Sequence, residues 1–169
     1  MIERTRTLTI ASNLKELHKV EAFIEEISED FNINHTYFGH LLVSLTEAVK
    51  NAIIHGNRGD EDKKVQIRFQ ARESSLQFSV KDAGDGFDYE NLPDPTESKE
   101  QSIGTGIFLI KQLSDKIEWI PPGNQLRFAF TIASINFAKS SERIRVLKDY
   151  YQGYGKKKEA EEEERRMKG

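Results

Sequence analysis

The sequence predicts an α/β two-layer sandwich, in which a mixed, mostly antiparallel sheet is covered on one face by helices. Segments that alternate apolar and polar residues, as half-buried strands do, occur near the start of the chain and again in two later pairs. Segments with the apolar spacing of helices separate them. Because each element is apolar on one side only, sheet and helices bury those sides against each other.

The first half of the chain is predicted to form one strand and two helices. Residues 5–10 alternate threonine with mostly apolar side chains. Asn13 precedes a helical pattern and Glu16 lies three residues later, which resembles a capping box. A second helix is predicted from about Thr36 to His55, where a glycine-containing loop ends it.

The second half is predicted to form two hairpins, with a glycine loop, a polar segment and a helix between them. Residues 81–88 follow a strand directly and form the glycine loop. Residues 89–101 are polar, contain two prolines and show no periodicity, so we expect a mobile loop or lid. A helix is predicted over residues 104–115. The predicted strands of the hairpins are 65–69, 76–80, 116–120 and 125–132.

Composition limits the class of protein. Of the 169 residues, 37% are apolar and 31% are charged, which suits a globular domain. We expect this domain to comprise residues 1–135, and residues 136–169 to form a helix with a charged, flexible tail. A net charge of −3 gives no general attraction to nucleic acid or to an anionic membrane. The chain has no cysteine, which excludes disulfides and thiolate metal sites. No stretch is long enough to cross a bilayer, so a cytoplasmic protein is expected.

The first candidate site element is a polar stripe formed by Glu47, Asn51 and His55, which are spaced by four on the second predicted helix. Each step of four overshoots a full turn by about 40°, so the three side chains lie along one side. An Asn carbonyl oxygen suits a hard cation such as magnesium, and a Glu near a phosphate could act as a general base. An ordinary solvated helix face gives the same pattern.

The second candidate element is the loop from Asp82 to Gly86, which follows a predicted strand. Asp82 could accept a hydrogen bond from an exocyclic amine such as that of adenine. Gly84 and Gly86 remove side chains where the backbone turns sharply or lies against a flat ligand. An acidic turn is the alternative, and a calcium loop is disfavoured because the full twelve-residue ligand pattern is missing.

The third candidate element opens a predicted helix with Ser102, Ile103, Gly104, Thr105 and Gly106. Backbone N–H groups at a helix start bind phosphate, and Thr105 adds a hydroxyl donor. The segment is neither a Walker loop nor a dinucleotide Gly-x-Gly-x-x-Gly motif. Each element is a weak signal alone, and their order around the predicted lid is what predicts an ATP site.

In this order, the three elements resemble the Bergerat-fold (GHKL) ATP-binding domain shared by gyrase, Hsp90, histidine kinases and the mismatch-repair protein MutL. The closest resemblance is to the single-domain anti-sigma factor serine/threonine kinases. It covers the chain from about Thr5 to Ile132 and includes LPDP at 92–95. The three matching boxes are EAVKNAIIHGN at 47–57, VKDAGDGFD at 80–88 and GTGIFLIKQLSDKIEW at 104–119.

The resemblance implies a role for each candidate residue. Asn51 would hold Mg²⁺ against the phosphates of ATP, and Glu47 would activate a Ser or Thr hydroxyl of a partner, an anti-sigma factor antagonist. Asp82 would bind the adenine amino group above a floor formed by Gly84 and Gly86. A sigma factor as a second partner and a homodimer are further expectations. The residues expected around the phosphates are Ser102, Ile103, Gly104, Thr105 and Gly106.

The residues just before the third box differ from those of many family members, and this difference leaves two functions open. Many members carry an arginine just before the third box, where Ser102 and Ile103 stand here, and Lys99 is the nearest cation. A lysine lacks the bidentate fork of an arginine. We therefore predict a serine/threonine protein kinase that uses ATP and Mg²⁺, with a non-catalytic ATP-dependent protein-binding switch as the alternative. Trp119 is interpreted as a packing side chain rather than a stacking platform.

Overall fold

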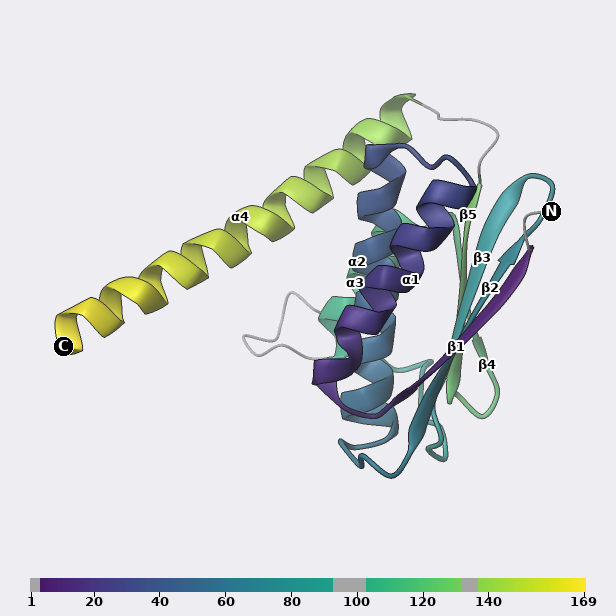
Figure 1. Cartoon of the computed structure of the whole chain (residues 1–169), viewed down its shortest axis with the longest axis horizontal. Coiled ribbons are helices and arrows are strands. Elements are labelled where there is room, and N and C mark those ends of the chain that lie inside the picture. Colours follow the sequence, from purple (N-terminus) through teal and green to yellow (C-terminus); the bar gives the residue numbers. More distant parts are fainter. Residues whose placement is uncertain (1–3, 93–102, 132–136) are drawn as a thin grey trace. The chain divides into compact units, whose positions relative to one another are not determined.

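The computed structural model describes residues 4–92, 103–131 and 137–169. They divide into two units, Met1–Ser134 and Ile135–Gly169, which are described separately. Figure 1 draws the elements in chain order, from purple to yellow. The predicted division into an ATP-binding domain over 1–135 and a tail over 136–169 stays a prediction.

In the described residues of the first unit, five strands form one sheet: β1 (Thr5–Ala11), β2 (Lys64–Ala71), β3 (Ser75–Lys81), β4 (Lys116–Ile120) and β5 (Gln125–Thr131). Their spatial order is β1-β2-β3-β5-β4, and all neighbouring pairs in this order run antiparallel. Two hairpins, β2–β3 and β4–β5, lie where the sequence predicts them.

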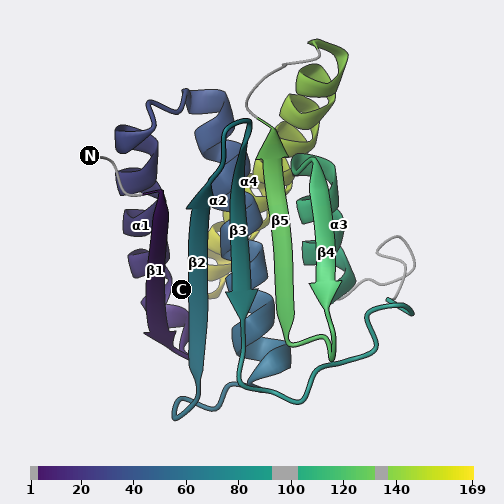
Figure 2. The same cartoon turned by 90° about the vertical axis from the view of Figure 1, so that its right-hand side faces the viewer.

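One face of the sheet is covered by α1 (Leu17–Asp30), α2 (His35–Asn51) and α3 (Ile103–Leu113). Figure 2 views the sheet from the opposite side, so these helices lie behind the strands. We call that opposite side the open face, because no helix of the described part of the first unit lies on it. The predicted two-layer sandwich with helices on one face is confirmed.

The start of the first helix differs from the predicted capping box. Asn13 does act as a cap, because its Oδ1 accepts a hydrogen bond of 2.9 Å from the Lys15 backbone N–H. The first turn, Leu14–Glu16, is a 3₁₀ turn, however, and the Glu16 carboxylate accepts from Lys19 Nζ at 2.6 Å. The backbone N–H of Asn13 donates to the Ala11 carbonyl instead, so the reciprocal half of the box is wrong.

The second helix also ends differently from the prediction, which carried it without a break to His55. Regular α-helix stops at Asn51, and Ala52–Gly56 form a π-helical turn. A π turn adds one residue to the hydrogen-bonded ring and is frequent at functional sites. Of the predicted stripe, the π turn contains His55, whereas Glu47 and Asn51 lie in regular α-helix.

The core lies between the sheet and the three helices. Most strand residues that face the helices are buried, as the alternation predicts, whereas Leu8, Ile117 and Trp119 on the edge strands are partly buried. The rings of Phe78 and Phe128 stack with their centroids 5.7 Å apart. Burying each large apolar side chain contributes about 1.5–3 kcal/mol. The buried strand residues are Ile10, Val65, Ile67, Phe69, Leu76, Phe78, Val80, Leu126, Phe128 and Phe130.

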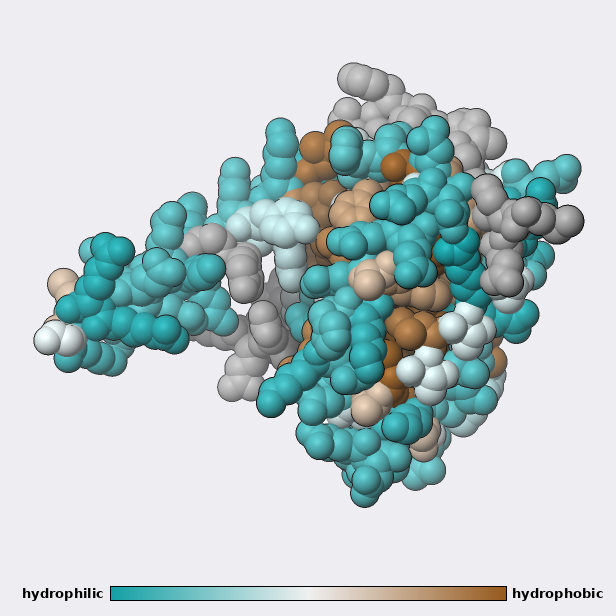
Figure 3. All heavy atoms as spheres, viewed as in Figure 1, coloured by the Kyte–Doolittle hydropathy of each residue, from teal (hydrophilic) through white to brown (hydrophobic). Residues whose placement is uncertain are grey.

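The described residues of the second unit form a single helix, α4 (Phe137–Lys168). Its C-terminal part is almost entirely hydrophilic in the space-filling view (Figure 3), in agreement with its charged sequence. Exposed apolar residues on this helix include Tyr151 and Met167. In the part of the chain that the structure describes, no helix combines the length and apolar composition needed to cross a membrane.

Candidate functional site

A cavity of about 240 Å³ lies where the end of α2, the loop after β3 and the β4–β5 turn meet. Its wall contains polar groups that could orient a ligand, together with two aromatic rings. It brings together the first two candidate elements of the sequence. The lining residues are Ala48, Asn51, Ala52, His55, Gly56, Val80, Asp82, Gly86, Phe87, Trp119, Gly123, Asn124 and Leu126.

Asp82 is held at the end of β3 by the β4–β5 turn. Its backbone N–H donates to the Asn124 carbonyl at 2.9 Å, and its Oδ1 accepts from the Gly84 N–H at 2.8 Å. Burial raises the pKa of the Asp82 carboxyl, while the hydrogen bond from Gly84 acts in the opposite direction. A fixed carboxylate at the wall of a largely apolar cavity is suited to accept a hydrogen bond from a ligand.

Two glycines allow the end of α2 to approach the Asp82 loop closely. A Cβ at Gly84 would lie 2.3 Å from the Gly56 carbonyl oxygen. A Cβ at Gly56 would lie 2.2 Å from the Asp82 carboxyl group. Gly84 was predicted as a site glycine, whereas Gly56 was interpreted only as part of the loop that ends the helix. Both positions exclude a side chain because two distant segments meet there.

Gly86 has a different constraint from Gly84. Its φ of +91° lies in the left-handed region, and a Cβ there would lie 2.1 Å from the Pro122 carbonyl oxygen. The loop after β3 therefore packs against the β4–β5 turn. Gly123, in that turn, also has a positive φ, of +104°, and faces Phe87. The sequence predicted this turn but not its place in the wall of the cavity.

Asn57 is a structural residue of the site that sequence reasoning missed. Its side chain is fully buried, its Oδ1 accepts from the Ala83 N–H at 2.8 Å, and its Nδ2 donates to the Lys64 carbonyl at 3.0 Å. It thereby joins the end of the π turn, the start of β2 and the Asp82 loop. The one signal in the sequence is its place as the last residue of the first matching box.

Glu47 and Asn51 meet the start of α3 at the other end of the cavity. A Cβ at Gly106 would lie 3.0 Å from Glu47 Oε2 and 3.1 Å from Asn51 Nδ2. A glycine at 106 thus lets the two helices approach with the polar side chains between them. The third candidate element therefore joins the first, as the resemblance implies.

The polar atoms of Glu47 and Asn51 differ in their partners. Glu47 is 9% exposed, and Lys50 Nζ lies 3.2 Å from its Oε1. The Asn51 Nδ2 is buried and has no hydrogen-bond partner within the described residues. A buried amide without a partner costs about 1–3 kcal/mol, so it indicates a place for a ligand or for water.

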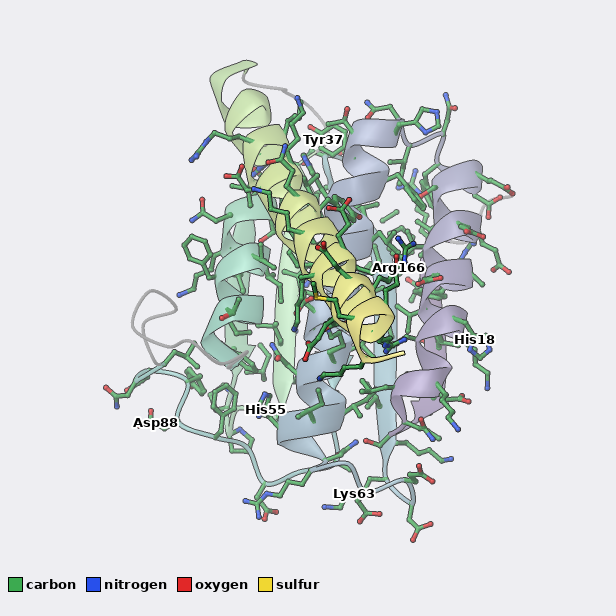
Figure 4. The ribbon with its side chains drawn as sticks, turned by 90° about the vertical axis from the view of Figure 1, so that its left-hand side faces the viewer. His18, Tyr37, His55, Lys63, Asp88 and Arg166 are labelled. Atoms are coloured by element: carbon green, nitrogen blue, oxygen red, sulfur yellow. The ribbon has the colours of Figure 1, made fainter. Side chains whose placement is uncertain are left out.

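His55 lines the cavity as well, but its side chain is largely exposed. Figure 4 shows it in the π turn after α2, with Lys63 further along in the loop that leads to β2. Partial burial lowers the pKa of the His55 imidazole, which favours the neutral form. Within the described residues, no group of three or more His, Cys, Asp or Glu side chains could hold a metal ion.

Trp119 both packs and lines the cavity. Its ring meets Phe87 edge-on at 4.6 Å and stacks on Tyr89 at 5.9 Å. These contacts agree with the interpretation of Trp119 as a packing residue. That interpretation did not include the place of Trp119, beside Phe87, in the wall of the cavity. Aromatic walls suit a flat apolar ligand such as a nucleotide base.

Part of the third candidate element lies outside the described residues. This part is Ser102, and residues 93–101 of the predicted lid, which include Lys99, lie outside them as well. Ile103, Gly104, Thr105 and Gly106 form the first turn of α3, as predicted for a helix that opens with glycines. Of these, Gly106 lies against Glu47 and Asn51, and none lines the cavity.

With this geometry, the chain matches the family of histidine kinase-like ATPase domains over residues 10–130, and it belongs to that family. ATP is therefore the nucleotide that its cavity is expected to take. Among similar proteins is the serine-protein kinase RsbW of Bacillus subtilis, 31% identical over 85 residues, which are 46% of this chain and 53% of that protein. RsbW of Staphylococcus aureus is 26% identical over 114 residues, 62% of this chain and 72% of that protein.

The chain spans about half the length of the first of these relatives, 53%. A crystal structure of the RsbU and RsbW domains of a Mycobacterium tuberculosis protein has the same fold, with a TM-score of 0.53 at 16% identity. That similarity covers 76% of this chain and 31% of the other. It supports the Bergerat-type architecture of the first unit.

Proposed function

We propose that this chain is a protein kinase of the anti-sigma factor type, which transfers the γ-phosphoryl group of ATP to a Ser or Thr of a small antagonist protein. The observation that carries the proposal is the meeting of Glu47, Asn51 and Gly106 beside a cavity that Asp82 closes at its other end. A sigma factor held by the same protein and a homodimer belong to this proposal, since both come from the resemblance.

The Asp82 end of the cavity would bind adenine. Its carboxylate would accept a hydrogen bond from the exocyclic amine, and Phe87 and Trp119 supply apolar surface for the ring. Gly86 would keep the floor of the cavity free of side chains. Because the Gly84 N–H and the Asn124 carbonyl already fix this loop, little ordering is left for the ligand to impose.

The Asn51 end would bind the phosphates and Mg²⁺. The donor set fits a magnesium ion that keeps most of its waters, because a single neutral amide oxygen, from Asn51, would complete a shell of phosphate and water oxygens. When bound, the ion neutralises phosphate charge. The backbone N–H groups of Gly104, Thr105 and Gly106, with Ser102 and Ile103 before them, would donate to phosphate oxygens.

Glu47 would accept the proton of the attacking hydroxyl as that oxygen bonds to the γ-phosphorus. The bond from this phosphorus to the bridging oxygen of the β-phosphate would break, and ADP would leave. The two oxygens of its carboxylate are divided, with Oε1 beside Lys50 and Oε2 beside Gly106. The oxygen beside Gly106 is the one close to the proposed phosphate site. Positioning and charge compensation, rather than covalent chemistry, would supply most of the rate enhancement.

The second candidate function is an ATP-dependent protein-binding switch without phosphoryl transfer. Ser102 and Ile103 favour it, because they stand where many family members have an arginine. In this alternative, nucleotide-dependent closure of the predicted lid would switch partners. All the roles of Asn51, Asp82 and the glycines would remain, and Glu47 would lose its role as a base.

The experiment that separates the two functions follows labelled phosphate from [γ-³²P]ATP, with Mg²⁺, to an antagonist protein encoded beside this chain. We expect label on the antagonist with wild type and a decrease of about 10²–10⁴-fold with Glu47→Ala. ATP binding by wild type and by Glu47→Ala, measured by calorimetry, is the control. Tight ATP binding with no transfer to any antagonist tested would contradict the kinase and support the switch.

A further inference from the structure

The open face of the sheet has a charge opposite to that of the unit that carries it. Residues 1–134 contain 15 Lys or Arg and 21 Asp or Glu, a formal net charge of −6. The open side of the strands nevertheless presents mostly cations, amides and hydroxyls. The cationic residues on the strands of this face are Lys64, Arg68, Lys81, Lys116 and Arg127, and Arg72 follows β2 directly.

The strand register brings two arginines into one row across the centre of the sheet. Arg68 on β2 is opposite Ser79 on β3, Ser79 is opposite Arg127 on β5, and Arg127 is opposite Glu118 on β4. Adjacent strands are about 4.8 Å apart, so the two guanidinium groups flank a single serine. A partner carboxylate above Ser79 could reach both.

The neighbouring rows extend the same chemistry. Lys81 lies between Gln66 and Gln125 in one row. In the row on the other side, Lys116 is opposite Ala129, whose small side chain projects little from the sheet. Cations therefore occur in three successive rows, separated by uncharged hydrogen-bonding groups.

The face is hollowed rather than flat. Two hollows of about 270 Å³ and 280 Å³ lie side by side on it and share Arg72, Gln77 and Arg127 in their linings. A concave surface lets side chains of a partner enter and become partly desolvated, which strengthens charge pairs.

The chain supplies little counter-charge to this face within its described residues. On the strands, the acidic side chain there is Glu118, and it is already bonded to Arg127 at 2.8 Å. Arg68, Lys81 and Lys116 make no ion pair with any described residue. Like charges on one sheet face repel, so a carboxylate-rich partner would relieve that repulsion.

We propose that the open face is a docking surface for a protein partner whose contacting surface is rich in Asp and Glu. Among the described residues no aromatic side chain points from the strands to this face, and recognition of single-stranded nucleic acid on a sheet uses aromatic platforms. Ile120 is the one large apolar side chain there, which disfavours insertion into a membrane. The surface is independent of the kinase proposal, because no residue that lines its two hollows also lines the cavity.

The test measures binding of a fluorescent glutamate- and alanine-rich helical peptide to the full chain, at low and at physiological ionic strength. We expect salt-dependent binding that weakens at least about tenfold in Arg68→Glu/Arg127→Glu, since each lost pair is also replaced by a repulsion. Lys15→Glu/Lys111→Glu makes the same charge change at exposed positions off this face and should bind as wild type does.

Arg127→Glu places a second carboxylate beside Glu118, so Arg68→Gln/Arg127→Gln is tested in parallel and should weaken binding in the same direction. ATP affinity should be unchanged in all variants, which keeps this test separate from that of the kinase. Peptide binding that is equal in wild type and both arginine variants overturns the proposal. So does tighter binding to single-stranded DNA of equal charge, or to phosphatidylserine vesicles, than to the peptide.

Discussion

The two ends of the cavity differ in how many of their polar groups the protein itself satisfies. At the Asp82 end, hydrogen bonds tie together the loop, the π turn and the β4–β5 turn. The Asn57 side chain and the Asn124 carbonyl accept from this loop, and the Gly84 N–H donates within it. At the Asn51 end, an amide nitrogen is buried without a partner among the described residues. One end is therefore held by its own hydrogen bonds, and the other keeps a buried donor that a ligand could satisfy.

Two asparagines six residues apart represent this difference. Asn57 is fully buried with both side-chain atoms bonded, so its role is to hold the loop. Asn51 has an unsatisfied Nδ2, so it is costly to the folded protein without a ligand. Hydrogen bonding therefore distinguishes Asn57, which holds the loop, from Asn51, the proposed ligand-binding asparagine. The predictions that follow use this contrast.

Asn57→Ala should have the largest effect on stability. It leaves the Ala83 N–H and the Lys64 carbonyl without their partner in the interior, at a cost of about 2–4 kcal/mol in the free energy of unfolding. Urea denaturation measures it. Asn57→Asp keeps the acceptor but places a buried carboxylate against the Lys64 carbonyl oxygen, so its cost should be at least as large. A change below the error of the measurement for the alanine variant would contradict the structural role.

Gly84→Ala should come next, because its methyl group would meet the Gly56 carbonyl oxygen at 2.3 Å. The backbone must shift, which costs about 1–3 kcal/mol and separates the π turn from the Asp82 loop. We expect lower ATP affinity in calorimetry together with a lower melting temperature. Gly153→Ala, with no atom within 4 Å of its added methyl, is the matched control and should not weaken ATP binding.

Asn51→Ala should separate stability from binding. Removing an unsatisfied buried amide should leave the free energy of unfolding unchanged or raise it by up to about 1 kcal/mol. Mg²⁺-dependent ATP affinity should fall by about 10–100-fold, as for other losses at a metal site. Urea denaturation measures the free energy of unfolding, and titration calorimetry with and without Mg²⁺ measures the ATP affinity. A large loss of stability with intact binding would reverse the assignment of the two ends.

Asp82→Asn should raise the stability slightly, opposite in sign to the effects of Asn57→Ala and Gly84→Ala. Burial raises the pKa of Asp82, so the folded state binds the proton more tightly than the unfolded state does. Tighter proton binding by Asp82 in the folded state adds to the free energy of unfolding. This addition is complete below the unfolded pKa of about 3.9, and it is lost as the pH rises through the raised folded pKa. At pH 7 the buried charge therefore destabilises the fold.

The asparagine variant should accordingly be slightly more stable than wild type at pH 7, and this difference should shrink towards pH 3. It can still accept the Gly84 hydrogen bond. ATP affinity should fall, because an amide is a weaker acceptor than a carboxylate for the adenine amine. Thermal melts across this pH range give the comparison, and a variant less stable than wild type at neutral pH would refute it.

Much of the site was predictable from local patterns. The spacing of Glu47 and Asn51, the Asp82 loop after a strand and the glycines that open α3 follow from residues close in sequence, and the structure brings Gly106 against the first two. The π turn after Asn51 was not predictable, because apolar spacing does not distinguish it from α-helix. Gly56, Asn57, Phe87 and Gly123 were missed as parts of the site because their roles arise from contacts between distant segments.

The sequence by itself determined the strands, the helices and the face that each buries, since apolar periodicity acts within each element. It also determined the three site elements and their order. The tertiary structure alone decided which glycines are obligatory, which asparagine is satisfied, and that six cations gather at one face of an acidic unit. These properties depend on strand register and on close approach between segments far apart in the chain, which no local pattern encodes.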